Sequence, residues 1–126
     1  MFGQYREQGV LLWRGFTFEQ VTSQCFATEK DKSKGRQMPI HYGSAELNFH
    51  TISSPLGTQL PQAVGAAYAD KLEQLKQGLE SPHRATCVYF GDGAASEGID
   101  LYGLQHNIQL SSQVYYNICQ VTFMVQ

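Results

Sequence analysis

The sequence has no long apolar run, no excess of positive charge and no repeated or low-complexity segment. No stretch approaches the roughly 20 apolar residues that a membrane-spanning helix needs, so we expect no membrane span. The formal net charge of −2 at pH 7 provides no positive field for nucleic acid or for an anionic membrane surface. Any anion that the protein binds must therefore be held by a local group of donors.

A targeting segment is also missing, because Met1 to Tyr5 form neither an apolar secretory stretch nor an arginine-rich transit segment. We therefore expect the 126 residues to be a fragment of a longer protein. The cysteines are odd in number, widely spaced and surrounded by apolar residues: Cys25, Cys87 and Cys119. This pattern favours buried thiols in a reducing compartment over disulfides or a metal site.

Hydrophobic residues make up 42 % of the chain and charged residues 16 %, which is typical of a globular protein. Thr17 has the position of a helix N-cap, and Gln20 completes a capping box three residues later. We expect this helix to fade after residue 28 and to stop by Gly35. Residues 35–51 show no periodicity and are expected to form an ordered loop.

Further along the chain, the pattern alternates between helix and strand. A helix is expected from about Leu60 to Gly78, since Pro61 fits only in a first turn. Residues 85–90 form a short apolar run typical of a buried strand, a helix is expected after Gly93, and residues 114–125 resemble a second strand. This order predicts an α/β fold with a parallel sheet flanked by helices.

The segment at residues 91–98, GDGAASEG, comes directly after the first expected strand, where such sheets bind ligands. Its glycines allow a tight turn and a close approach of backbone N–H groups to an oxyanion, and the next helix start adds its positive dipole end. Asp92 suits Mg²⁺, which prefers one or two carboxylates together with phosphate oxygens. A diphosphate bridged through Mg²⁺ would fit these donors.

Taken alone, Gly91-Asp92-Gly93 is more commonly a helix-entry turn in which the aspartate caps the next helix. The spacing of its third glycine, Gly98, does not match the dinucleotide-binding fingerprint, and the segment lacks the lysine of a phosphate-binding P-loop. The two interpretations of this segment, ligand site and simple turn, stay open at this level.

Four segments in order, however, resemble the alpha subunits of the thiamine-diphosphate-dependent 2-oxo acid dehydrogenase family. Residues 91–98 resemble the opening of the thiamine-diphosphate motif, and residues 2–7 (FGQYRE) are similar to the segment that reaches the diphosphate. Residues 35–43 look like the branched-chain subfamily rather than the pyruvate one. Residues 51–59 (TISSPLGTQ) resemble the cofactor and potassium loop.

This resemblance spans residues 2–98 and implies a thiamine-diphosphate-binding fold that is incomplete here. Residues 1–126 are thus expected to be a partial thiamine-diphosphate-binding domain, with a divergent tail at residues 99–126. The family continues to a strand that ends in two asparagines, one of which binds Mg²⁺. Asn117 is followed by Ile118 instead, so we expect it to be a strand residue rather than the second Mg²⁺ ligand.

The resemblance also implies a set of site residues. The cofactor would contact Tyr5, Arg6, Ser54, Gly93 and Ala94. Asp92 would bind Mg²⁺, and a structural K⁺ would be surrounded by Ser53, Pro55, Thr58 and Gln59. Arginine suits phosphate because it donates two hydrogen bonds at once. Without the resemblance, Arg6 would be interpreted as a surface charge paired with Glu7, and residues 53–55 as a helix cap.

No catalytic acid or base is expected in this chain. The spacing of His41 and His50 suits no compact metal-ligand pair, so structural or loop roles are favoured for both. Glu97 is not expected to act as the general acid, because in this family the beta subunit supplies the glutamate that activates thiamine.

The implied activity is oxidative decarboxylation of branched-chain 2-oxo acids, with acyl transfer to the lipoyl domain of an acyltransferase component. The implied assembly is an α2β2 heterotetramer with a beta subunit, in the mitochondrial matrix or, in a bacterium, in the cytoplasm. The alternative is a truncated, non-catalytic fragment that only binds a partner subunit. We expect the chain alone to be inactive and of low stability, since an incomplete sheet exposes an edge.

Overall fold

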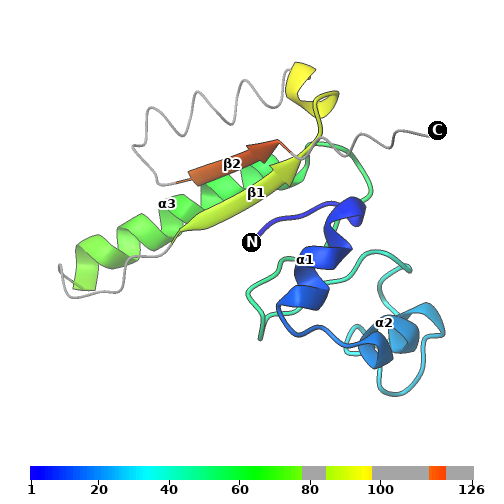
Figure 1. The fold of residues 1–126 in the computed structure, drawn as a ribbon. Coiled ribbons are helices and arrows are strands. Elements are labelled where there is room, and N and C mark those ends of the chain that lie inside the picture. The colour runs from blue at the N-terminus through cyan, green and yellow to red at the C-terminus, as the bar shows by residue number, and fades with distance from the viewer. Residues whose placement is uncertain (78–84, 98–113, 119–126) are drawn as a thin grey trace.

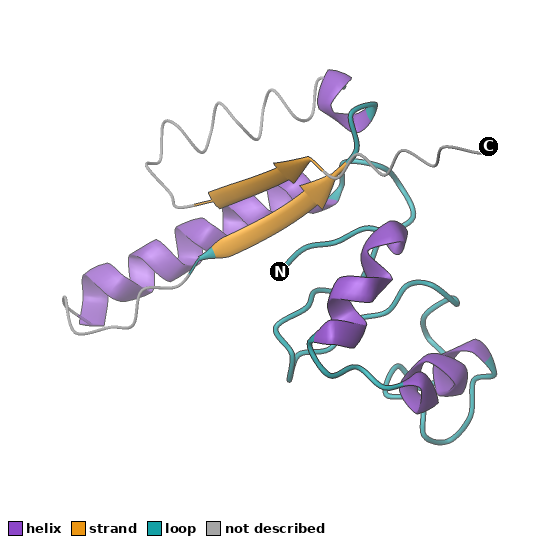
Figure 2. Ribbon diagram, viewed as in Figure 1, coloured by secondary structure: helices purple, strands orange, loops and turns teal. Residues whose placement is uncertain are grey.

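The computed structural model describes residues 1–77, 85–97 and 114–118. Its elements in chain order are η1 (Tyr5–Glu7), α1 (Gln8–Trp13), α2 (Phe18–Cys25), α3 (Gln59–Gln77), β1 (Thr86–Phe90), η2 (Ala94–Ser96) and β2 (Val114–Ile118). Helix α3 runs along the two strands, whereas α1 and α2 lie in a second group of elements that is rich in loops (Figures 1 and 2). Within the described residues, none of the helices combines the length and apolar character that crossing a membrane requires.

Strand β1 has a parallel neighbour on each side. It pairs with β2, with Val88 opposite Tyr116, and it forms a parallel bridge with Phe2 of the amino-terminal segment. The amide of Phe2 donates to the carbonyl of Cys87 at 2.8 Å, and the amide of Tyr89 donates to the carbonyl of Phe2 at 2.9 Å. Since successive strand residues direct their backbone groups to opposite edges, Phe2 lies on the edge of β1 away from β2. All three segments therefore run toward the same end.

Two buried clusters hold these elements together. The first lies between α3 and β1 and consists of Phe2, Leu60, Ala63, Val88, Phe90 and Ala94. The second joins α1 to the loops around it and consists of Leu11, Phe16, Tyr42, Phe49 and Ile52. Burying one such large side chain contributes roughly 1.5–3 kcal/mol. Small Ala63, which is fully buried, lets the α3 backbone approach β1 closely.

The amino-terminal segment connects the two clusters. The ring of Phe2 stacks on the ring of His50, with centroids 4.0 Å apart and planes inclined by 11°. The amide of His50 donates to the carbonyl of Met1 at 2.9 Å. A Cβ at Gly3 would lie 2.7 Å from the Cζ of Phe49, so only glycine lets the segment pass this ring without rearrangement. The segment is thereby held between β1 and the loop at residues 42–52.

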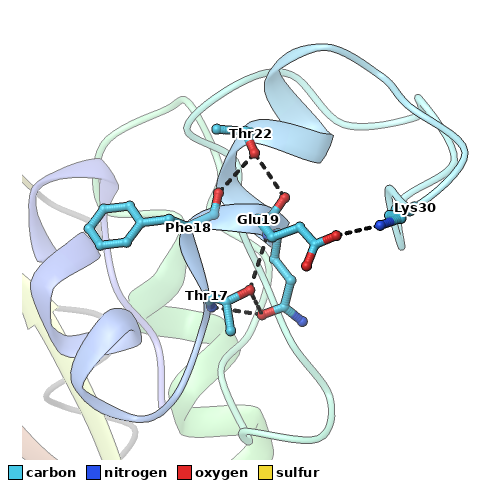
Figure 3. Close-up of polar contacts among 6 residues, drawn as sticks. Thr17, Phe18, Glu19, Thr22 and Lys30 are labelled. Carbon is cyan, nitrogen blue, oxygen red and sulfur yellow. Dashed lines mark hydrogen bonds and ion pairs between the residues drawn. The ribbon is translucent and has the colours of Figure 1, made fainter.

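The capped helix expected at Thr17 is present as α2. The hydroxyl of Thr17 accepts from the amide of Gln20 at 3.2 Å, and the amide of Thr17 donates to the side chain of Gln20 at 2.8 Å (Figure 3). Its expected end was wrong, because the helix stops at Cys25 and Ala27 takes a φ of 48°. A residue in the left-handed region cannot continue a right-handed helix.

Helix α1 was not predicted from the sequence, because its six residues are too few to show a helical period. The helix expected from Leu60 is α3, which begins one residue earlier. The prediction of an ordered loop at residues 35–51 is confirmed: the buried side chain of Gln24 donates to the carbonyls of Met38 and His41 at 2.8 and 3.0 Å.

The strand expected at residues 85–90 is β1, and β2 covers the first five residues of the strand expected at 114–125. Of the helix expected after Gly93, the structure describes only the single turn η2. The residues expected to continue this helix and the tail beyond residue 118 lie outside the described residues.

The prediction of buried thiols was wrong for Cys25, which is exposed, while Cys87 is half-buried. The side of α2 that packs inward carries Ser23 and Gln24, so the next residue faces solvent. The Cys25 thiol lies 3.3 Å from the hydroxyl of Tyr42. Cys119 lies outside the described residues.

Candidate functional site

The chain turns at the carboxyl end of β1 through Gly91, Asp92 and Gly93, and all three residues are partly or fully exposed. Gly93 has φ −62° and ψ −45°, so it needs none of the conformational freedom that the sequence suggested for it. The space beside both glycines is open, since a Cβ added to Gly91 or Gly93 would meet no atom within 4 Å. A ligand can therefore approach the backbone at this turn.

The carboxylate of Asp92 is exposed at this turn and makes a local hydrogen bond. Its Oδ1 accepts from the amide of Gly93 at 2.9 Å. The N-cap of η2 is Gly93 and has no side-chain cap, so Asp92 does not act as the cap of that turn. Ala94, by contrast, is buried against α3 and anchors the segment. The carboxylate of Asp92 thus faces solvent on a turn that the buried Ala94 anchors to the core.

Tyr5 and Arg6 reach the same end of β1 because Phe2 pairs with this strand in parallel. The Nε of Arg6 donates to the hydroxyl of Tyr5 at 3.2 Å, and its guanidinium lies 5.4 Å from the centre of the tyrosine ring. This hydrogen bond is the main cause that raises the pKa of Arg6, and the negative charges of Glu7 and Asp92 add to it. The negative charge of Asp92 therefore acts weakly on the guanidinium of Arg6.

The alternative pairing of Arg6 with Glu7 is not found among the ion pairs of the described residues. Glu7 is buried at 5 % exposure, and its Oε2 accepts from the amide of Gln4 at 2.6 Å. Arg6 is left exposed. An arginine held by a tyrosine rather than by a carboxylate keeps its donors available for a phosphate.

The loop before α3 contains the remaining predicted residues. The hydroxyl of Thr58 donates to the carbonyl of Pro55 at 3.2 Å, and Ser53 is half-buried. The side-chain amide of Gln59 donates to the carbonyl of Tyr89 at 2.9 Å, which ties the loop to the end of β1. The segment thus carries hydroxyl, carbonyl and amide oxygens, and Gln59 ties it to the strand end.

Ser54 is exposed, and its hydroxyl lies 2.6 Å from Nε2 of His41. The sequence offered no signal for this contact, because the two residues belong to irregular segments without a period. Asn117 lies within β2, opposite Tyr89 in the register, and so precedes the strand end by one residue. Asp92, in contrast, follows the end of its strand.

No group of three histidine, cysteine or acidic side chains in residues 1–77, 85–97 and 114–118 could hold a metal ion. Among the described residues, a cation at Asp92 would therefore not be held by a cluster of such side chains. Mg²⁺ accepts such a site, because it combines few carboxylates with phosphate oxygens.

The model of the family described as "Dehydrogenase E1 component" matches residues 1–121. The chain is 59 % identical over 98 residues to the mitochondrial 2-oxoisovalerate dehydrogenase subunit alpha of Caenorhabditis elegans, covering 78 % of this chain and 21 % of that protein. It is 49 % identical over 117 residues to subunit alpha 1 of Arabidopsis thaliana, covering 93 % of this chain and 23 % of that protein. The chain spans about a fifth of the length of these relatives.

Proposed function

The chain belongs to the dehydrogenase E1 component family, and we propose that it forms part of a thiamine-diphosphate-binding alpha subunit that acts on branched-chain 2-oxo acids. The relatives named 2-oxoisovalerate dehydrogenase subunit alpha support this substrate class. Their names also support a mitochondrial location, which we propose to be the matrix. The observation that carries the proposal is that Arg6 and the open glycine turn with Asp92 lie at the same end of β1, because Phe2 pairs with this strand in parallel.

The residues at this edge fit a diphosphate and its metal ion. Arg6 would donate to phosphate oxygens, with Tyr5 holding its guanidinium. The exposed carboxylate of Asp92 would bind Mg²⁺, and the backbone at Gly93 and Ala94 would lie against the cofactor, since no Cβ fills the space at Gly93. Ser54 would add a hydroxyl from the neighbouring loop.

A structural K⁺ is proposed in the loop that leads to α3. The carbonyl of Pro55 and the hydroxyl of Thr58 are already adjacent. Ser53 and the amide oxygen of Gln59 would complete the set, because the amide nitrogen of Gln59 is used on Tyr89. Such an ion would stiffen the loop that carries Ser54.

When bound, thiamine diphosphate supplies the carbon nucleophile and the electron sink that decarboxylation of a 2-oxo acid needs. The proposed task of this chain is to hold the diphosphate end and its metal ion. A beta subunit would contribute the glutamate that activates thiamine, in an α2β2 heterotetramer. A lipoyl domain of the acyltransferase component would receive the acyl group.

The proposal is tested by thermal unfolding of the chain assembled with a beta subunit, with and without thiamine diphosphate and Mg²⁺. A ligand at about 100 times its Kd stabilises the folded state by about 2.7 kcal/mol, so the melting temperature should rise. Asp92→Asn keeps an acceptor for the amide of Gly93 but loses the charge, and it should abolish the shift. The exposed carboxylate of Glu97 provides the matched control, and Glu97→Gln should leave the shift intact.

Absence of a shift in the unaltered chain would contradict cofactor binding and favour the non-catalytic alternative, a fragment that only binds a partner subunit. A shift that persists in Asp92→Asn would contradict the metal assignment alone.

A further inference from the structure

The turn η1 combines buried and exposed residues within four positions. Gln4 and Glu7 are buried, whereas Tyr5 and Arg6, which lie between them, are exposed. Glutamate is rarely buried in proteins, because its charged group loses hydration unless other groups of the protein bind it. Glu7 therefore needs an interaction inside the fold.

Glu7 and Gln4 are joined by two reciprocal hydrogen bonds. Oε2 of Glu7 accepts from the main-chain amide of Gln4 at 2.6 Å, and the main-chain amide of Glu7 donates to the carbonyl of Gln4 at 3.2 Å. The direction of both bonds is settled, since a main-chain amide can only donate. The two bonds close the chain around Tyr5 and Arg6 and fix the backbone from which these two side chains project.

The closed turn is attached to β1 at a defined point. Phe2 pairs with Val88 in parallel, and Gly3 passes the ring of Phe49 with no room for a side chain. The turn begins at the next residue, so few free dihedral angles separate it from the strand. Its two exposed residues therefore keep their direction relative to β1 as long as the turn stays closed.

The bond to Gln4 also keeps the glutamate away from the neighbouring arginine. A carboxylate beside an arginine can form an ion pair that uses the guanidinium donors. Here Oε2 of Glu7 is used on Gln4, and the described residues contain no ion pair between Glu7 and Arg6. Arg6 is held at its Nε by the hydroxyl of Tyr5, and this bond does not use the two terminal nitrogens of the guanidinium.

We propose that Glu7 is a positioning residue, which closes the turn around Tyr5 and Arg6 and thereby holds the guanidinium for an oxygen of the cofactor's diphosphate. This inference rests on the proposed function, since it needs the anion at this end of β1. Glu7 is buried and acts only through the residue before it. An arginine that is held before the anion arrives loses less conformational freedom when the anion binds.

The test compares variants of the alpha subunit assembled with its beta subunit, and measures the Kd of thiamine diphosphate with Mg²⁺ by calorimetry. Glu7→Leu leaves the buried amide of Gln4 without its acceptor and should weaken binding about tenfold. Glu7→Gln keeps an acceptor oxygen at the same place, so its Kd should stay within about threefold of that of the unaltered protein.

Gln20→Leu is the matched control. Gln20 makes the same kind of bond at the start of α2, where its side chain accepts from the amide of Thr17 at 2.8 Å. This variant should lower the melting temperature but leave the Kd within about twofold, because α2 is remote from the end of β1. A loss of affinity as large as in Glu7→Leu would make general destabilisation the cause and would overturn the inference.

Arg6→Ala tests whether Glu7 acts through the arginine. Once Arg6 is removed, Glu7→Leu should cause no further loss, so the double variant should bind as Arg6→Ala does. An unchanged Kd in Glu7→Leu, a Glu7→Gln variant as weak as Glu7→Leu, or a further loss in the double variant would each overturn the inference. If Asp92→Asn still abolishes binding in those cases, the proposed function stands. If the unaltered complex binds no cofactor, both proposals fail.

Discussion

The side-chain amide of Gln59 donates a hydrogen bond to the main-chain carbonyl of Tyr89 at 2.9 Å. This bond joins the first residue of α3 to the penultimate residue of β1, which are 30 positions apart. It holds the loop with Ser54 and Thr58 beside the turn that carries Asp92. A residue at 6 % exposure therefore ties the start of α3 to the end of β1.

Replacement of Gln59 by leucine should lower the free energy of unfolding by about 1–3 kcal/mol, because the partly buried carbonyl of Tyr89 loses this donor. Urea unfolding measures the difference. Gln62→Leu is the matched control, since Gln62 is exposed on the same helix and should change stability by less than about 0.5 kcal/mol. Equal effects of the two variants would contradict the role assigned to the bond.

Two glycines should respond to alanine in opposite directions. A Cβ at Gly43 would lie 2.5 Å from the hydroxyl and 2.7 Å from the Cα of Thr51, so Gly43→Ala should destabilise the protein by about 1–3 kcal/mol or more. Gly65 lies within α3 with no atom within 4 Å of its Cβ position, and Gly65→Ala should stabilise by roughly 0.5–1 kcal/mol. Melting temperatures of the two variants test this prediction. If both variants raise the melting temperature, or both lower it, the prediction is contradicted.

Two threonines of α2 make different hydrogen bonds (Figure 3). Thr17 accepts from the amide of Gln20 and caps the helix, so Thr17→Ala should cost about 1 kcal/mol. Thr22 donates to the carbonyls of Phe18 and Glu19, which as helix carbonyls also accept backbone hydrogen bonds. Thr22→Ala should therefore be close to neutral. The comparison is made by thermal unfolding, and a larger loss for Thr22→Ala would refute this assignment.

Acid should destabilise the fold through His50. Partial burial of the exposed His50, with a smaller contribution from the amino-terminal charge, lowers its pKa below the ordinary value of 6.5. As the pH falls through 6.5, the unfolded chain binds a proton that the folded chain resists, so stability is lost. The urea midpoint should therefore be lower at pH 5.5 than at pH 7.5.

His50→Phe keeps a ring that can stack on Phe2 and removes the titration. The fall of the midpoint between pH 7.5 and pH 5.5 should be smaller in this variant than in the unaltered protein. An equal fall in both proteins would exclude His50 as its source.

Local patterns predicted most of the regular elements. The capping box at Thr17, the position of Pro61 and the apolar run at residues 85–90 act over a few residues, so they could be recognised in isolation. The end of α2 could not, because Ala27 terminates the helix through a backbone conformation that many residues avoid. Helix α1 was missed for a related reason, since its short span is stabilised by the cluster around Leu11 rather than by its own sequence.

The sequence by itself determined the strand before Gly91, the acidic turn after it and the resemblance to a family, because each is written in consecutive residues. Only the tertiary structure decided that Arg6 lies at the same end of β1 as Asp92, since this follows from the parallel pairing of Phe2 with Val88. It also decided that His41 contacts Ser54 and that Gln59 contacts Tyr89. Contacts between distant segments depend on how the two buried clusters pack, and no short pattern encodes that packing.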